Sequence, residues 1–75
     1  MTAIITDAQI GLRIRAARNS RGLTAKALSL RLGWAPSRIS RIERADVPLS
    51  VMDLQTIAEA LGVDAPAFIS EAFNI

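Results

Sequence analysis

The twenty residues from Ala25 to Arg44 read AKALSLRLGWAPSRISRIER, and they have the layout of two short helices separated by a break at Gly33. Apolar residues lie one helical turn apart on each side of the break: Leu28 and Leu32 before it, Ile39 and Ile42 after it. Such spacings place each pair on one helix face, and a glycine can adopt the positive φ that ends a helix. Ser29 is small enough to let two helices approach closely. The stretch therefore predicts two short helices that cross at a steep angle.

Start and stop signals extend this layout toward the N-terminus. Thr6-x-x-Gln9 matches a capping box, and the apolar face of Ile10, Ile14 and Ala17 predicts a helix that ends near Arg21, with Gly22 after its end. Thr24 can cap the helix that Gly33 terminates. Pro36 suits the first turn of the next helix, which we expect at about residues 36–44.

Further signals follow toward the C-terminus. Ser50-x-x-Asp53 opens a helix whose apolar stripe runs to Gly62, and Asp64 with Pro66 starts a fifth helix, expected over residues 64–75. No segment alternates like a strand over a useful length. The sequence therefore predicts an all-α fold of five helices with short connections, which form a single domain over residues 1–75.

Charge is divided unevenly along the chain. Residues 1–44 hold all nine basic residues and two acids, a balance of +7, whereas residues 45–75 hold five acids and no base, a balance of −5. The net charge of +2 thus hides a polarised molecule. Its positive part contains the two crossing helices, which is the electrostatic pattern of a nucleic-acid-binding surface.

Composition excludes several other classes of protein. The chain has no cysteine and no histidine, which argues against a disulfide scaffold, a zinc module or thiol chemistry, and we expect no metal and no cofactor. No nucleophile–base pair or carboxylate pair stands out, so an enzyme is not expected. The first ten residues, MTAIITDAQI, lack the features of a signal peptide, and no apolar run reaches the length of a membrane span. The expected location is the cytoplasm.

A family resemblance rests on two runs of the sequence. IGLRIRAARNSRGLTAKALSLRLGWAPSRISRIERA, followed by LQTIAEALGV, resembles the Cro/repressor-type helix-turn-helix family, the lambda-repressor-like domain of phage and bacterial regulators. The resemblance covers about residues 9–63. It implies a five-helix bundle that places its third helix in the major groove of DNA, commonly as a symmetric dimer.

Helix geometry predicts which side chains of the third helix face DNA. With Ile39 and Ile42 buried, Ser37, Arg41 and Arg44 point away from the core, whereas Arg38 and Glu43 lie on opposite flanks. Ser37 and Arg41 can reach base edges, and a guanidinium matches the O6/N7 pair of guanine. We expect Arg38 and Arg44 to bind phosphate, together with the hydroxyl of Thr24.

The resemblance adds Pro36 to Ser37 and Arg41 as a base-contacting position. It also implies an ion pair between Arg18 and Glu43 that joins the first and third helices, although such an arginine can touch phosphate as well.

Three positions depart from the family pattern. Ala25 stands where the family often has a glutamine that bonds a phosphate, and Pro36 can offer only apolar contact to a thymine methyl. Ala45 replaces the glycine usual after the third helix, so a left-handed conformation there is strained. Base readout therefore rests on few residues. Trp34, at the turn, is expected to pack as a lid over the first three helices.

The C-terminal segment carries surplus apolar residues. Ile69, Phe73 and Ile75 exceed what a core of this size can bury, which favours a homodimer contact in the segment 64–75. The alternatives are that these residues close the intramolecular core or that the chain is part of a longer protein.

Two classes of function follow from these features. The first is a sequence-specific DNA-binding transcription regulator that binds an operator as a homodimer, with double-stranded DNA as its partner. The alternative is an antitoxin or a helix-turn-helix module for protein–protein interaction, with a toxin or polymerase as a possible partner. Outward basic residues on the third helix favour the first.

Overall fold

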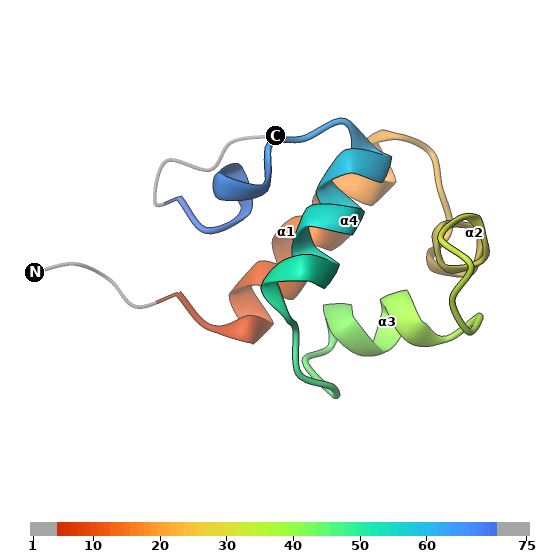
Figure 1. Cartoon of the computed structure of the whole chain (residues 1–75), viewed down its shortest axis with the longest axis horizontal. Coiled ribbons are helices and arrows are strands. Elements are labelled where there is room, and N and C mark those ends of the chain that lie inside the picture. The colour runs from red at the N-terminus through yellow and green to blue at the C-terminus, as the bar shows by residue number, and fades with distance from the viewer. Residues whose placement is uncertain (1–4, 71–75) are drawn as a thin grey trace, which may run out of the picture.

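The computed structural model of the protein describes residues 5–70, which form four α-helices and one turn of 3-10 helix (Figure 1). The helices are α1 (Asp7–Ser20), α2 (Ala25–Arg31), α3 (Arg38–Glu43) and α4 (Val51–Leu61), and the 3-10 turn η1 spans Ala65–Phe68. Within residues 5–70 there is no strand. Figure 1 views α2 nearly end-on while α3 runs across the view, so these two helices cross steeply, as the stretch 25–44 predicts.

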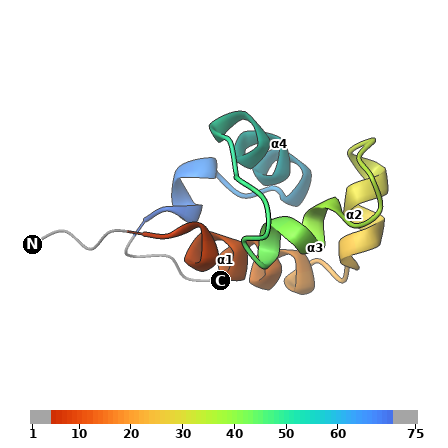
Figure 2. The same cartoon turned by 90° about the horizontal axis from the view of Figure 1, so that it is seen from below.

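One hydrophobic core joins the four helices and η1. Figure 2 shows α4 across from α1, with η1 near one end of this pair and α2 at the other. The buried apolar side chains come from every element: Ile10, Ile14, Ala17, Leu28, Ile39, Ile42, Leu54, Ile57, Ala58, Leu61 and Phe68. Their helical spacing is the one that the sequence shows, and Trp34 packs half-buried against their edge.

The three N-caps read from the sequence are present. The Thr6 hydroxyl accepts a hydrogen bond from the Gln9 N–H at 3.1 Å, and the Gln9 side chain accepts one from the Thr6 N–H at 2.9 Å, which completes the capping box. Thr24 and Ser50 each accept a bond at 3.0 Å from the N–H three residues later. These bonds satisfy amide groups that a helix start leaves unpaired.

All four α-helices end in the same way. Two backbone hydrogen bonds close the last turn, and the residue after it has a left-handed conformation. In α3, the Asp46 N–H donates to the Arg41 carbonyl at 2.9 Å and the Ala45 N–H donates to the Ile42 carbonyl at 3.0 Å. Three of the left-handed positions hold glycine, but the fourth holds Ala45, with φ of 58°. The Cβ of alanine makes this conformation unfavourable.

We therefore expect Ala45→Gly to raise the free energy of unfolding by about 1 kcal/mol, because glycine removes the left-handed strain at little cost in contacts. Ala45 is exposed, so no packing is lost. Urea denaturation followed by circular dichroism measures the change. Ala16→Gly, at an exposed position inside α1, is the matched control and is expected to cost about 1 kcal/mol. Equal losses in both variants would show that Ala45 is unstrained.

The third helix is shorter than the expected 36–44. It begins at Arg38, after a turn in which the Arg38 N–H donates to the Ala35 carbonyl at 3.0 Å, and it ends at Glu43. Ala35 has no side chain that could cap a start at Pro36, and Ser37, at the position before the helix, makes no side-chain cap bond. The start therefore depends on a contact from α2, described below.

The fifth helix also differs from the expectation. In place of an α-helix beginning at residue 64, the structure has the single 3-10 turn η1, and residues 71–75 lie outside the described residues. The Asp64 side chain makes no cap bond. The Arg13 guanidinium donates to the carbonyls of Phe68 and Ser70, at 2.9 and 2.6 Å. These carbonyls are therefore already bonded across the fold to α1.

Neither a membrane span nor a metal cluster is found between residues 5 and 70. No helix there is long and apolar enough to cross a membrane, and no group of three or more acidic, histidine or cysteine side chains is placed to hold a metal ion.

Candidate nucleic-acid interface

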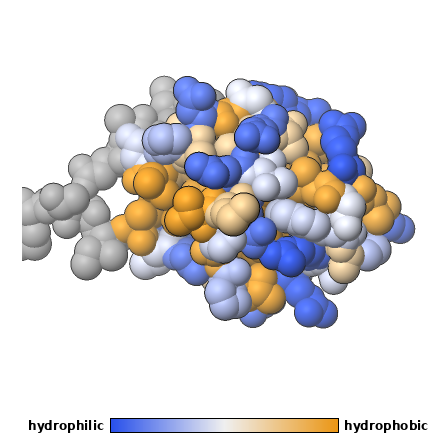
Figure 3. All heavy atoms as spheres, in the orientation of Figure 1, coloured by the Kyte–Doolittle hydropathy of each residue, from blue (hydrophilic) through white to orange (hydrophobic). Residues whose placement is uncertain are grey.

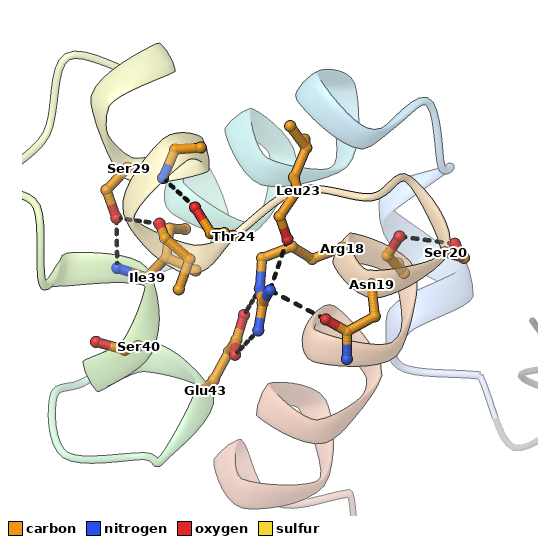
Figure 4. Close-up of polar contacts among 12 residues, drawn as sticks. Arg18, Asn19, Ser20, Leu23, Thr24, Ser29, Ile39, Ser40 and Glu43 are labelled. Carbon is orange, nitrogen blue, oxygen red and sulfur yellow. Dashed lines mark hydrogen bonds and ion pairs between the residues drawn. The ribbon is translucent and has the colours of Figure 1, made fainter.

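The start of α3 is held by a serine of α2. The Ser29 hydroxyl accepts a hydrogen bond from the Ile39 N–H at 3.0 Å and donates one to the Ala25 carbonyl at 2.9 Å (Figure 4). Ser29 and Ile39 are both fully buried. Because α3 has no cap of its own, this bond supplies a partner for one of its unpaired amides. It also fixes where α3 begins relative to α2.

A buried ion pair holds one flank of α3 against α1. The Arg18 Nε and Nη2 atoms donate to the two carboxylate oxygens of Glu43, at 2.7 and 3.0 Å (Figure 4). The remaining nitrogen, Nη1, donates to the Leu23 carbonyl at 2.7 Å and to the Asn19 side chain at 3.1 Å. The hydrogen bonds to Glu43 raise the pKa of Arg18 above its ordinary value, although burial acts in the opposite direction.

The geometry of Arg18 bears on its two expected roles. Both side chains of the pair are buried, with 10% of Arg18 and 6% of Glu43 exposed. Binding of Arg18 to a phosphate requires breaking a bidentate pair and leaving the Glu43 carboxylate buried without a partner, which is costly. The position of Arg18 therefore supports the structural role and makes a DNA contact by this side chain energetically unfavourable.

The opposite flank of α3 is held against α4. Arg38 Nη2 donates to the Asp53 carboxylate at 2.6 Å, and the guanidinium lies over the Trp34 ring, 4.6 Å from its centroid. The sequence placed Arg38 on a flank but did not identify either partner. Arg38 is thus half-buried and already paired.

The outward face of α3 contains the other expected contact residues. Pro36, Ser37, Arg41 and Arg44 are all exposed. Pro36 and Ser37 precede the helix and Arg44 follows its last residue, so of these four residues the helical projection holds for Arg41 alone. Arg44 pairs with Asp46 at 2.9 Å, but both side chains are more than half exposed, so the pair is weak. Between residues 5 and 70, Arg41 forms no ion pair and is the unneutralised cation of α3.

A hollow of about 400 Å³ lies beside this face. Its lining comes from the turn before α3, from α3 itself and from the loop that follows: Ala35, Ser37, Arg38, Arg41, Val47 and Pro48. The hollow therefore places Arg38 and Arg41 on one surface, together with the exposed Ser37. Such a surface combines two guanidinium groups with apolar walls.

Exposed basic residues extend beyond α3. Arg15, Arg21, Lys26 and Arg31, on α1, on the turn after it and on α2, are exposed and form no ion pair within the part of the chain that the structure describes. The Thr24 hydroxyl is exposed at the start of α2, where it accepts the Ala27 N–H. The positive charge seen in the sequence is thus available on the surface near the two crossing helices.

The expected dimer residues are only partly placed. Ile69 is 49% exposed just after η1, and Phe73 and Ile75 lie outside the described residues. Figure 3 shows that apolar side chains gather on part of the surface seen in this view. Ile69 thus leaves about half of a large apolar side chain in contact with solvent.

Gly11 allows α1 to pack closely against α3, a role that was not predicted from the sequence. A Cβ atom at this position would meet the Glu43 carbonyl group, with its carbon at 2.8 Å, and the Ile42 carbonyl oxygen at 2.9 Å. Glycine is therefore what lets α1 contact the backbone of α3 at its C-terminal end. The sequence does contain a signal for this contact. Gly11, Ile14 and Arg18 lie on one stripe of α1, and a glycine inside a helix indicates close packing.

Comparison with known proteins agrees with this architecture. A family model described as helix-turn-helix matches residues 14–68. Two curated relatives, both named HTH-type transcriptional regulator RamB, come from Mycobacterium tuberculosis strains CDC 1551 / Oshkosh and ATCC 25618 / H37Rv. Each is 42% identical to the chain over 62 residues, which cover 83% of the chain and 13% of the relative. The chain thus spans a small part of these relatives' length. No solved structure matches it at comparable significance.

Proposed function

The chain belongs to the Cro/repressor-type helix-turn-helix family of DNA-binding transcription regulators, and we propose that it binds a specific operator as a homodimer with α3 in the major groove. The observation that carries this proposal is the placement of Arg41. It is the exposed, unneutralised cation of a helix that is fixed to its neighbours on both flanks. A guanidinium on a rigid helix is suited to bidentate recognition of guanine.

The other expected contacts take their roles around Arg41. Ser37 and Pro36 are exposed just before α3 and are proposed to meet base edges, Pro36 through apolar contact alone. Arg44 and the Thr24 hydroxyl are proposed to bind phosphate, since both are exposed next to the two crossing helices. The guanidinium of Arg38, by contrast, is already paired with Asp53.

Homodimer formation is proposed through the segment that contains Ile69. Its support is the half-exposed Ile69 side chain and the apolar residues Phe73 and Ile75 in the sequence after it. A symmetric dimer binds two half-sites related by a two-fold axis, so its preferred DNA sequence is a palindrome. Selection from randomised duplexes tests sequence preference and symmetry together.

Two substitutions distinguish base reading from phosphate binding. Arg41→Ala is expected to weaken binding to the selected duplex by about 1–3 kcal/mol and to relax preference at one position of each half-site. Arg44→Ala is expected to weaken all duplexes alike and to reduce the slope of log affinity against log salt by about one. Titrations by fluorescence anisotropy at several salt concentrations measure both.

The contrary outcomes are distinct. Equal losses on selected and random duplexes for Arg41→Ala exclude Arg41 as a base reader. If the wild-type chain shows no salt-dependent DNA binding near 50 mM salt, where the electrostatic contribution is large, the regulator proposal fails. The protein-interaction alternative then replaces it.

A further inference from the structure

Arg38 is the most constrained cation on the proposed DNA-binding surface. It is the first residue of α3, and its guanidinium lies between the Trp34 ring, at 4.6 Å, and the Asp53 carboxylate, at 2.6 Å. Its Nε atom is buried without a hydrogen-bond partner. Two elements outside α3 thus hold this side chain: the turn before α3 and the first turn of α4.

The Asp53 side chain is partly buried near the start of α4. It lies in the first turn of α4, where the unpaired amides of the helix favour an anion, and its own N–H is bonded to the Ser50 hydroxyl. The side chain is 24% exposed, against 54% for Asp46 in the neighbouring ion pair with Arg44. Water and salt therefore screen the Arg38–Asp53 pair less than the Arg44–Asp46 pair.

The location of the pair connects it to DNA binding. Arg38 lines the same hollow as Ser37 and Arg41, so it lies on the surface proposed to face DNA. A free arginine at this place could bind a phosphate of the backbone. Phosphate contacts add affinity for DNA of every sequence but carry no sequence information themselves. An intramolecular carboxylate therefore competes with the phosphate for this arginine.

We propose that Asp53 restrains the sequence-independent part of DNA binding by keeping Arg38 in an intramolecular ion pair. The inference rests on the proposed function only as far as the chain binds DNA through this surface. It assigns Asp53, on α4, a role as a positioning residue that acts on DNA binding through Arg38. Discrimination between sequences is then left to Arg41 and its neighbours.

The test is Asp53→Asn, measured on a random-sequence duplex between 50 and 200 mM salt. Asparagine keeps the backbone N–H that bonds Ser50, and it removes the charge that holds Arg38. A released Arg38 that binds one phosphate steepens the log–log salt slope by about 0.9, so the loss of affinity over this fourfold salt range becomes about 3.5 times larger. Circular dichroism melting verifies that the variant is folded.

Two further variants separate the release of Arg38 from a simple change of net charge. Glu59→Gln removes the same charge from an exposed position later in α4, where the described residues provide no ion-pair partner, and it is expected to leave the slope unchanged. The double variant Arg38→Gln with Asp53→Asn replaces the ion pair by two neutral amides. It is expected to return to the wild-type slope.

Three outcomes decide the matter. A steeper slope in Asp53→Asn that disappears in the double variant supports the inference. Provided that the wild-type chain binds DNA, two results for Asp53→Asn overturn the inference: a salt slope equal to that of Glu59→Gln, or a loss of affinity. Because the duplex is random, failure to select a preferred sequence bears on the proposed function alone, whereas absence of all wild-type binding overturns both.

Discussion

Glu43→Ala is expected to lower the free energy of unfolding by about 3–5 kcal/mol, because it leaves the guanidinium of Arg18 buried without its carboxylate partner. Arg18 is held in place by bonds to Leu23 and Asn19, so it cannot reach water without disturbing the end of α1. A domain of this size has a total stability on the order of 5–15 kcal/mol, so the variant is close to unfolding. Urea denaturation followed by circular dichroism measures the loss.

The matched control removes the pair instead of breaking it. Arg18→Met combined with Glu43→Leu replaces both charges by apolar side chains of similar size, and we expect it to recover most of the stability lost in Glu43→Ala. Recovery identifies the loss as the cost of an unpaired buried charge. A loss of a few tenths of a kcal/mol in Glu43→Ala contradicts the assignment, because it shows that the guanidinium finds solvent or another partner.

Local signals account for the parts of the fold that the sequence predicted well. Caps such as Thr6 and Thr24, and the glycines after the helices, act on amide and carbonyl groups within a few residues, so their neighbours in sequence are enough to identify them. The apolar faces of α1 and α4 likewise follow from helical periodicity alone. The family resemblance then implied the Arg18–Glu43 pair.

Contacts between elements account for what was not predicted. The Ser29 hydroxyl caps α3 from ten residues away, and Asp53 binds Arg38 across fifteen residues. Neither contact has a periodic signature, because each depends on how two helices are placed in space. The start of α3 at Arg38 has the same origin, since its cap is supplied by α2. The 3-10 turn at Ala65–Phe68 likewise coincides with bonds from Arg13 of α1 to nearby carbonyls.

These contacts together explain how a helix of six residues can hold an outward side chain in a fixed position, as the proposed function requires. α3 is too short to be stable alone. Glu43 binds it to α1, the Ile39 N–H donates to the Ser29 hydroxyl of α2, and Arg38 binds it to α4. Arg41 projects from the side that none of these bonds occupies, so its position is set by three neighbouring helices.

The contact of α1 with the backbone of α3 is the remaining support, and Gly11→Ala tests it. Replacement of a glycine inside a helix by alanine normally stabilises the helix by about 1 kcal/mol. Here the added methyl group overlaps the carbonyl groups of Glu43 and Ile42, which are backbone atoms and cannot rotate away as a side chain can. We therefore expect Gly11→Ala to lower the free energy of unfolding by about 3 kcal/mol, as measured by urea denaturation.

The sign of the change in unfolding free energy shows whether helix propensity or close packing dominates at Gly11. Helix propensity predicts that Gly11→Ala stabilises the fold, and close packing predicts that it destabilises the fold. Leu12→Ala, at the next position of α1, is the control: Leu12 is 62% exposed, and its truncation is expected to change stability by about 0.5 kcal/mol or less. A stabilised Gly11→Ala variant excludes the close approach of α1 to α3. If α3 instead shifts to accommodate the methyl group, Arg41 moves with it, and a folded Gly11→Ala variant loses affinity for the selected duplex.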